Sequence, residues 1–224
     1  MAEPVKKAAF YDVDGTLIRT NIVDAYAYYA MNSGSVLESA KRVGRAMAKG
    51  PLFWALDKYN RKLFNESFYR EYEGLTEDRL RLLSQDLFDD VLEDAIFPGS
   101  YDLIEEARKS GCRIVLVTGS LDFTMEPLAR HLKADDLIAN RMQFVGNVAT
   151  GRVMPPLLEG AHKAKVMRDY CVKHGLQLDK SHAYTDSMSD YPMLAIVGRP
   201  TAVNPDMRLR TTARSYEWPI LDIR

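Results

Sequence analysis

The sequence lacks any apolar run that approaches the length of a membrane span. A transmembrane helix needs about 20 consecutive, mostly apolar residues, and no stretch of the 224 residues meets this requirement. The N-terminal residues 1–7 also lack the long apolar centre of a secretory signal peptide. We therefore expect a soluble, cytoplasmic protein with no transmembrane segment.

The sequence also has few cysteines and a small net charge. Cys112 and Cys171 lie in a strand-like and a helix-like segment, and neither has the spacing of a zinc site or a disulfide framework. We interpret both as reduced packing residues. The formal net charge is −1, so no overall field favours nucleic acid as a partner. The composition indicates no oligomeric state.

The sequence does contain a short apolar strand, residues 8–11, that runs into Asp12, Asp14, Gly15 and Thr16. Ligands of open α/β sheets bind at the carboxyl ends of strands, which is where these two aspartates stand. Two carboxylates so close repel each other, and Mg²⁺ suits such a pair because it prefers oxygen ligands and needs few from the protein. The same string also fits a strand closed by an ordinary Asp-Gly turn, so the rest of the chain must decide.

Strand patterns are absent from residues 20–95, which carry apolar residues at helical spacing instead. We expect helices at about 21–30, 35–49, 52–66 and 77–91. Their aromatic residues, including Phe53, Trp54 and Tyr59, indicate the core of a small helical unit more than a ligand site. Basic residues gather in the first half of this segment and acidic residues in the second. The two halves can pair with each other, or the basic half can face an anionic substrate or lipid.

Strands and helices alternate after the break at Pro98-Gly99. We expect strands at 113–117, 182–185, 201–203 and 220–223, and a small hairpin at about 141–154. Such alternation is typical of an α/β fold in which helices cover both faces of a mostly parallel sheet. The sequence thus predicts a core formed by 1–19 and 96–224, interrupted by the all-helical segment 20–95.

Polar residues follow three of the expected strands: Asp12 and Asp14, Thr118, and Asp186 with Asp190. All of them can meet at one crevice, and phosphoryl transfer needs such a set. One carboxylate can attack phosphorus and form an acyl-phosphate, while a second protonates the leaving oxygen and later takes a proton from water. Hydroxyl and backbone N–H groups hold the phosphoryl oxygens, and Mg²⁺ and a lysine neutralise their charge.

The lysine must come from another element. The helix expected at 161–174 begins after Gly160 and carries both Lys163 and Lys165 in its first turns. Either side chain can reach the crevice from there, with Asp186 or Asp190 as an acidic partner. The local pattern does not choose between the two lysines.

These motifs resemble those of the haloacid dehalogenase superfamily of phosphatases. The four that match are Asp12-Val13-Asp14-Gly15-Thr16, Thr118-Gly119, Lys163, and Asp186-Ser187-Met188-Ser189-Asp190. Their order and strand context agree with that superfamily over nearly the whole chain. The resemblance implies a Rossmann-like α/β core, and the helical segment 20–95 resembles the superfamily's C1 cap. The branch it most resembles is subfamily IB, which is phosphoserine-phosphatase-like.

The resemblance implies roles for the acidic residues. Asp12 is the nucleophile and a Mg²⁺ ligand. Asp14 is the general acid and base, and its backbone carbonyl also binds Mg²⁺. Asp186 is a further Mg²⁺ ligand, and Asp190 supports the waters of the metal or the lysine.

It also implies how the phosphate is held. Gly15, Thr118 and the Gly119 amide bind the phosphoryl oxygens, and Lys163 neutralises the charge of nucleophile and phosphate. Lys163 fits this role better than Lys165 because its spacing from Gly160 matches the branch. The expected activity is Mg²⁺-dependent hydrolysis of a small phosphorylated metabolite through an aspartyl-phosphate.

Two positions depart from the phosphoserine phosphatases. A glutamate that reads the substrate's amine is replaced here by Asn21, which cannot pair with an ammonium group, and the usual asparagine of the last motif is Ser189. Phosphoserine is therefore not the expected substrate. A phosphotransferase or mutase using the same intermediate, and a non-catalytic module that binds through the helical segment, are alternative hypotheses.

Overall fold

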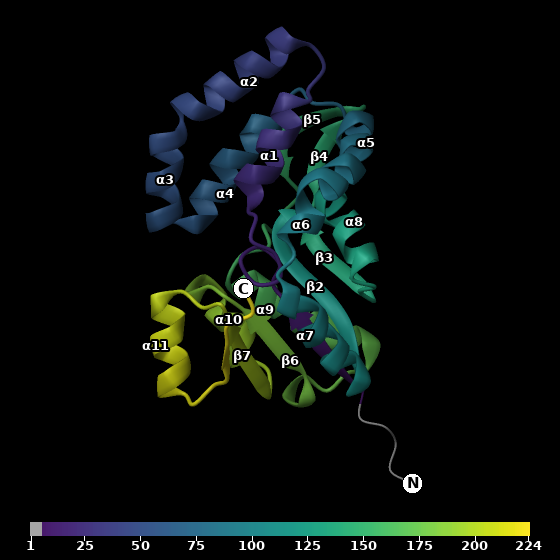
Figure 1. Cartoon of the computed structure of the whole chain (residues 1–224), viewed down its shortest axis with the longest axis vertical. Helices are drawn as coiled ribbons and strands as arrows, with labels where there is room; N and C mark the ends of the chain where they lie inside the picture. Colours follow the sequence, from purple (N-terminus) through teal and green to yellow (C-terminus); the bar gives the residue numbers. More distant parts are fainter. Residues whose placement is uncertain (1–5) are drawn as a thin grey trace.

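The computed structural model of the chain describes residues 6–224, apart from the side chains of Asp57 and Arg61. The first five residues of the predicted core therefore lie outside the described residues. The main sheet has six strands in the order β3-β2-β1-β6-β7-β8, and all of its pairs are parallel (Figure 1). Its strands are β1 (Lys7–Tyr11), β2 (Cys112–Leu121), β3 (Asp136–Asn140), β6 (His182–Thr185), β7 (Arg199–Val203) and β8 (Ile220–Leu221).

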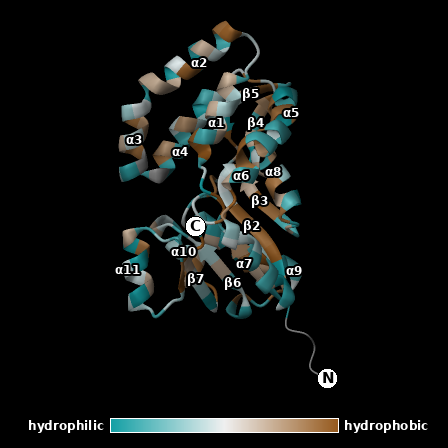
Figure 2. Ribbon diagram, in the orientation of Figure 1, coloured by the Kyte–Doolittle hydropathy of each residue, from teal (hydrophilic) through white to brown (hydrophobic). Residues whose placement is uncertain are grey.

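Helices cover both faces of this sheet because its central strands are apolar on both sides. Phe10 of β1 packs with Met167 and Leu209 on one face, and Tyr11 packs with Leu103 on the other, as the alternation of a strand requires. The middle of strand β2, residues 114–117, is strongly hydrophobic, and most of the strand carries the hydrophobic colour in Figure 2. The core helices are α7 (Pro98–Lys109), α8 (Asp122–His131), α9 (Ala161–His174), α10 (Tyr191–Ala195) and α11 (Met207–Ser215), with short helical turns η3 (Leu178–Lys180) and η4 (Met188–Asp190). The predicted α/β fold class is confirmed.

Strand β3 is an element that the sequence did not predict. It lies at the edge of the sheet, begins with Asp136, and has one buried residue, Asn140. Aspartate is rare in strands. Here Arg113 of the neighbouring strand β2 stabilises Asp136 by donating a hydrogen bond to its carboxylate over 2.7 Å. Tertiary contacts thus supply what the local pattern lacks.

The segment between β1 and β2 is helical, as predicted, and lies above the sheet in Figure 1. It comprises α1 (Ile22–Met31), α2 (Val36–Ala48), α3 (Gly50–Tyr59), α4 (Arg61–Tyr69), η1 (Arg70–Tyr72), α5 (Glu77–Leu87), the π-helical turn η2 (Phe88–Leu92) and α6 (Glu93–Ala95). The single helix predicted at 52–66 is wrong: the chain breaks at Asn60, whose side chain accepts from the Leu63 N–H over 3.1 Å and caps α4. Phe53 is buried as expected, but Trp54 and Tyr59 are exposed.

The predicted hairpin is present as β4 (Met142–Val145) and β5 (Val148–Val153), a separate antiparallel pair. It is hydrogen-bonded to the helical segment. The Gly74 N–H donates to the Ala149 carbonyl over 3.0 Å, and the Ala149 N–H donates to the Leu75 carbonyl over 2.8 Å. The hairpin therefore fastens η1 and the start of α5 to the core. No helix within residues 6–224 is both long and apolar enough to cross a membrane.

Two glycines of the hairpin test this attachment. Both have positive φ, +61° at Gly146 and +69° at Gly151. A Cβ at Gly151 would lie 2.9 Å from Arg70 Cα, whereas one at Gly146 would meet nothing within 4 Å. We expect Gly146→Ala to lower the free energy of unfolding by about 1–2 kcal/mol through backbone strain. Gly151→Ala should lower the free energy of unfolding by about 1–3 kcal/mol more than Gly146→Ala, because its Cβ also clashes with the Arg70 backbone. Urea unfolding measures both, and equal losses would contradict a tight hairpin–helix contact.

Candidate active site

A small crevice of about 110 Å³ opens at the carboxyl ends of β1, β2 and β6. It is lined by Asp12, Asp14, Ile22, Asn65, Gly119, Glu159, Lys163, Asp186, Ser187, Ser189 and Asp190. Six of these are residues that the sequence predicted for the site. Of the remaining predicted residues, Gly15 and Thr118 lie directly behind the acidic groups. All eight predicted residues are therefore brought together.

The turn after β1 places Asp12 and supports Asp186. The backbone N–H of Asp12 donates to the Tyr184 carbonyl of β6 over 2.9 Å, which brings the two strand ends together. Gly15 has φ +81°, and a Cβ there would lie 2.3 Å from an Asp186 carboxylate oxygen. Only glycine allows this approach. Thr16 then accepts from the Asp186 N–H over 3.0 Å, and its hydroxyl lies 3.1 Å from Asp186 Oδ1.

Lys163 is the buried cation of the crevice. Its Nζ lies 2.7 Å from Asp12 Oδ1 and 2.7 Å from Asp190 Oδ2, and 3% of the residue is exposed. Burial by itself lowers the pKa of Lys163, but the two carboxylates more than reverse this and hold the pKa above its ordinary value. Lys165 is exposed on α9. The structure therefore places Lys163, and not Lys165, among the acidic groups.

Asp14 is held by hydroxyl groups instead of by the lysine. Its Oδ2 accepts from the Ser120 hydroxyl over 2.7 Å and from the Thr118 hydroxyl over 3.3 Å. Thr118 is fully buried and also accepts from the Ser120 N–H over 2.9 Å. Asp12 and Asp14, two residues apart, thus have different surroundings, which lets one act as a nucleophile and the other as an acid or base.

The peptide of Gly119 is fixed from two sides. Its carbonyl accepts from the side-chain amide of Asn140 over 2.6 Å and from the Tyr69 hydroxyl. The carbonyl of Asn140's own side chain accepts from the Leu158 N–H over 2.8 Å. Because Tyr69 belongs to α4, the helical segment helps to orient the end of β2.

Asp186 is surrounded by negative charge. Burial, and after it the Asp12 carboxylate, raises the pKa of Asp186 to about 7 from an ordinary value of 3.8. The Thr16 hydroxyl lies within 3.4 Å of Asp12 Oδ2 as well as beside Asp186. The Asp12 and Asp186 carboxylates thus lie on either side of the Thr16 hydroxyl. A divalent cation stabilises such a buried pair of carboxylates.

Sequence reasoning missed several residues of the crevice wall. Behind that wall, Thr16 stood inside a recognised motif and Ser120 directly after one, so both could have been included on that ground. Asn65 of α4 and Glu159 of the loop before α9 had no local signal, because they lie 94 residues apart and meet only in the fold, at 2.9 Å.

Asn21, at the position of the expected substrate-reading glutamate, serves as a helix cap. Its Oδ1 accepts from the Val23 N–H over 2.8 Å at the start of α1, and Asp24 closes the capping box. Its side chain is exposed and does not line the catalytic crevice. Substrate recognition in the crevice must therefore depend on side chains other than Asn21.

Comparisons with known proteins agree with this arrangement. A family model described as haloacid dehalogenase-like hydrolase matches residues 9–195. The chain is 29% identical over 218 residues to a phosphoserine phosphatase, SerB1, of Mycobacterium tuberculosis, covering 97% of this chain and 71% of that protein.

Two solved structures are similar in fold. A protein of unknown function from Bordetella pertussis has a TM-score of 0.83 and 22% identity, over 98% of this chain and all of that one. A phosphoserine phosphatase bearing a phospho-aspartyl intermediate analogue has a TM-score of 0.69 and 20% identity, over 98% and 94% of the two chains.

The Thr16 hydroxyl provides a test of how Asp186 is held. Thr16→Val removes the acceptor of the buried Asp186 N–H at nearly constant volume, so we expect a loss of about 1–3 kcal/mol in the free energy of unfolding. Thr16→Ser keeps the hydroxyl and should restore most of this loss. Urea unfolding of the three proteins is the measurement. Equal stability of the valine variant and the parent chain would show that the hydroxyl does not support the Asp186 loop.

Proposed function

Because the chain belongs to the haloacid dehalogenase-like hydrolase family, we propose that it is a Mg²⁺-dependent phosphatase that acts through an aspartyl-phosphate. Its phosphoserine phosphatase relatives make it a hydrolase of phosphate monoesters. The observation that carries the mechanism is the position of Lys163, clamped between Asp12 and Asp190 and beside the separately held Asp14.

In the first step, a carboxylate oxygen of Asp12 attacks the phosphorus, and the bond to the ester oxygen breaks. Asp14 gives its proton to the departing alcohol, and Lys163 balances the charge on the phosphoryl oxygens. In the second step, Asp14 takes a proton from water as the water attacks the aspartyl-phosphate. Inorganic phosphate leaves and the Asp12 carboxylate is restored. We assign the Gly119 N–H, Gly15 and Thr118 to holding the phosphoryl group.

The acidic residues fit a magnesium ion. The Asp12 and Asp186 carboxylates and the Asp14 carbonyl are the groups that we propose would hold it. When bound, the ion would neutralise the phosphate and the facing carboxylates. Within residues 6–224, no three or more His, Cys, Asp or Glu side chains form a ready-made metal cage. This agrees with the proposed set, because Mg²⁺ is commonly held by one or two carboxylates together with waters.

A substitution at the proposed nucleophile tests the mechanism. We expect Asp12→Asn to lower the rate of phosphate release from a chromogenic phosphate ester by about a thousandfold or more. Asp102→Asn, on the exposed side of α7, is the matched control and should retain full activity. Circular dichroism of both variants checks that the fold persists. Substantial turnover by a folded Asp12→Asn protein would refute a nucleophilic Asp12.

Metal removal tests the proposed cofactor. Chelation should abolish phosphate release, and added Mg²⁺ should restore it. We expect Asp186→Asn to raise the Mg²⁺ concentration for half-maximal activity by roughly 10–100-fold. Mg²⁺ should also raise the melting temperature of the parent chain, because a ligand that binds only the folded state stabilises it. Full activity after exhaustive chelation would contradict the proposal.

A further inference from the structure

A mostly apolar cavity lies inside the helical segment. It has a volume of about 580 Å³ and is enclosed by α1, α2, α3 and α4. Its walls are almost entirely apolar and aromatic, with Tyr26, Phe53, Phe64 and Phe68 among them, and the polar residues Asn21 and Asp24 lie at one end. Its volume falls within the range of about 300–1,000 Å³ that is usual for small-molecule sites.

The cavity and the catalytic crevice share walls. Ile22, at the first turn of α1, lines both of them. The adjacent residues Phe64 and Asn65 of α4 line the cavity and the crevice respectively. Ile22 is buried, with 6% of the residue exposed, so its side chain stands between the two spaces. The two spaces are therefore neighbours that share the Ile22 side chain as a wall.

The sizes of the two spaces decide how they are used. The crevice, at about 110 Å³, has roughly a fifth of the cavity's volume of about 580 Å³, and its walls are polar and charged. It suits a phosphoryl group and few further atoms. The non-reacting part of a larger substrate must therefore extend outward, and the cavity offers it an apolar surface.

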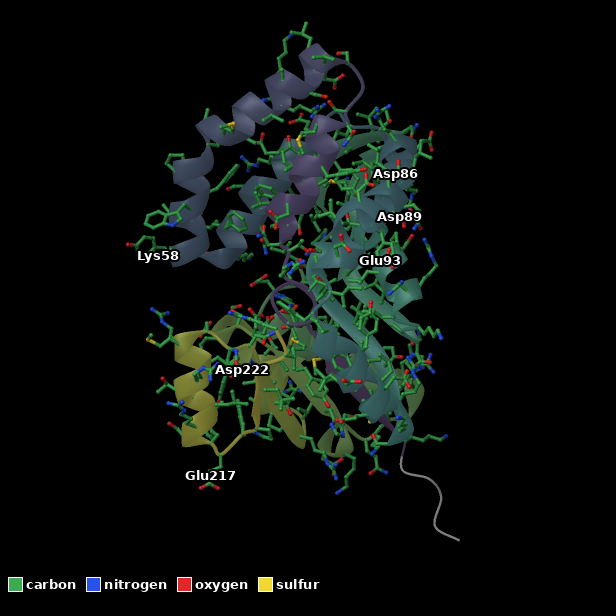
Figure 3. All side chains as sticks on the ribbon, viewed as in Figure 1. Lys58, Asp86, Asp89, Glu93, Glu217 and Asp222 are labelled. Carbon is green, nitrogen blue, oxygen red and sulfur yellow. The ribbon has the colours of Figure 1, made fainter. Side chains whose placement is uncertain are left out.

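The outer side of the cavity is open to such a molecule. Helix α2 buries a single side chain, Arg42, and leaves the cavity-lining Met47 74% exposed. Trp54 of α3 also lines the cavity and is 68% exposed, with Lys58 Nζ 5.3 Å from its ring. In Figure 3, Lys58 projects from α3 on the side of the molecule opposite the acidic residues Asp86, Asp89 and Glu93. The cavity mouth is thus apolar, which suits the apolar chain of a substrate, and the Lys58 ammonium group lies outside the cavity lining.

We propose that this enzyme acts on phosphate monoesters that carry an apolar chain, with the phosphate in the crevice and the chain in the α1–α4 cavity. The hydrolysis part of this inference rests on the proposed phosphatase function. The inference also explains the presence of Asn21. A substrate with an apolar chain has no ammonium group that would need a charged partner at this position. A concave cavity lined by four helices and open on its outer side favours a single inserted chain over contact with a flat bilayer surface.

The first experiment compares phosphate release from methyl, butyl and octyl phosphate at concentrations below micelle formation. Each methylene buried in the cavity should raise kcat/KM about fourfold, the equivalent of about 0.8 kcal/mol. Ala46→Phe on α2 fills the cavity and should lower the octyl-to-methyl ratio of kcat/KM at least tenfold. Ala40→Phe, exposed on the same helix and outside the cavity, should leave this ratio unchanged. Hydrolysis at rates independent of chain length would overturn the inference while leaving the phosphatase function intact.

The second experiment measures binding without turnover. The chain has two tryptophans, so Asp12→Asn combined with Trp218→Phe leaves Trp54 as the only fluorescent indole. Octyl phosphate should shift Trp54 emission to shorter wavelength and bind at least tenfold more tightly than butyl phosphate. Inorganic phosphate should leave the emission unchanged.

The binding experiment decides the inference even if no ester is hydrolysed. Absence of a Trp54 response to octyl phosphate would overturn it. A response confined to vesicles of anionic phospholipid would also overturn it, because that result would mark the α2–α3 face as a membrane contact instead of a chain-binding site.

Discussion

The Lys163 ammonium group is buried between the carboxylates of Asp12 and Asp190, and the rest of the site depends on this cluster of charges. Removing any of the three from water is costly, and the cost is offset only when opposite charges meet at short distance. Asp12 follows β1, Lys163 begins α9 and Asp190 follows β6. The contact therefore requires the parallel sheet to hold these ends in one register, so the fold and the chemistry impose the same constraint.

A second constraint is the close approach between the turn after β1 and the Asp186 loop. Gly15 leaves room for the Asp186 carboxylate, and Thr16 bonds to that loop. The approach buries Asp186 and places it in the field of Asp12, and burial first and the Asp12 carboxylate second raise the pKa of Asp186. The lysine faces Asp12 and Asp190, and the divalent cation that we propose would face Asp12 and Asp186.

The helical segment contributes to the crevice as well as covering it. Tyr69 donates to Gly119, Asn65 bonds to Glu159, and the hairpin ties η1 to β5. These contacts hold α4 and the start of α5 to the core, whereas α2 lies at the outside with one buried side chain. The acidic groups of the crevice thus follow strands of the sheet, and the walls of the α1–α4 cavity come from the helices. The larger cavity among those helices follows from the same division.

The sequence by itself determined the α/β class, the helical segment, the hairpin and the eight predicted residues that meet at the crevice, because these depend on local features. Apolar runs define strands, glycines and prolines end elements, and the order of the motifs follows the order of the strands. Only the tertiary structure buried Lys163 between Asp12 and Asp190 and brought Asn65 to Glu159. It also built β3 on an aspartate and left Trp54 exposed at a cavity. Each of these outcomes depends on which distant surfaces pack together, and a local pattern carries no information about contacts across tens of residues.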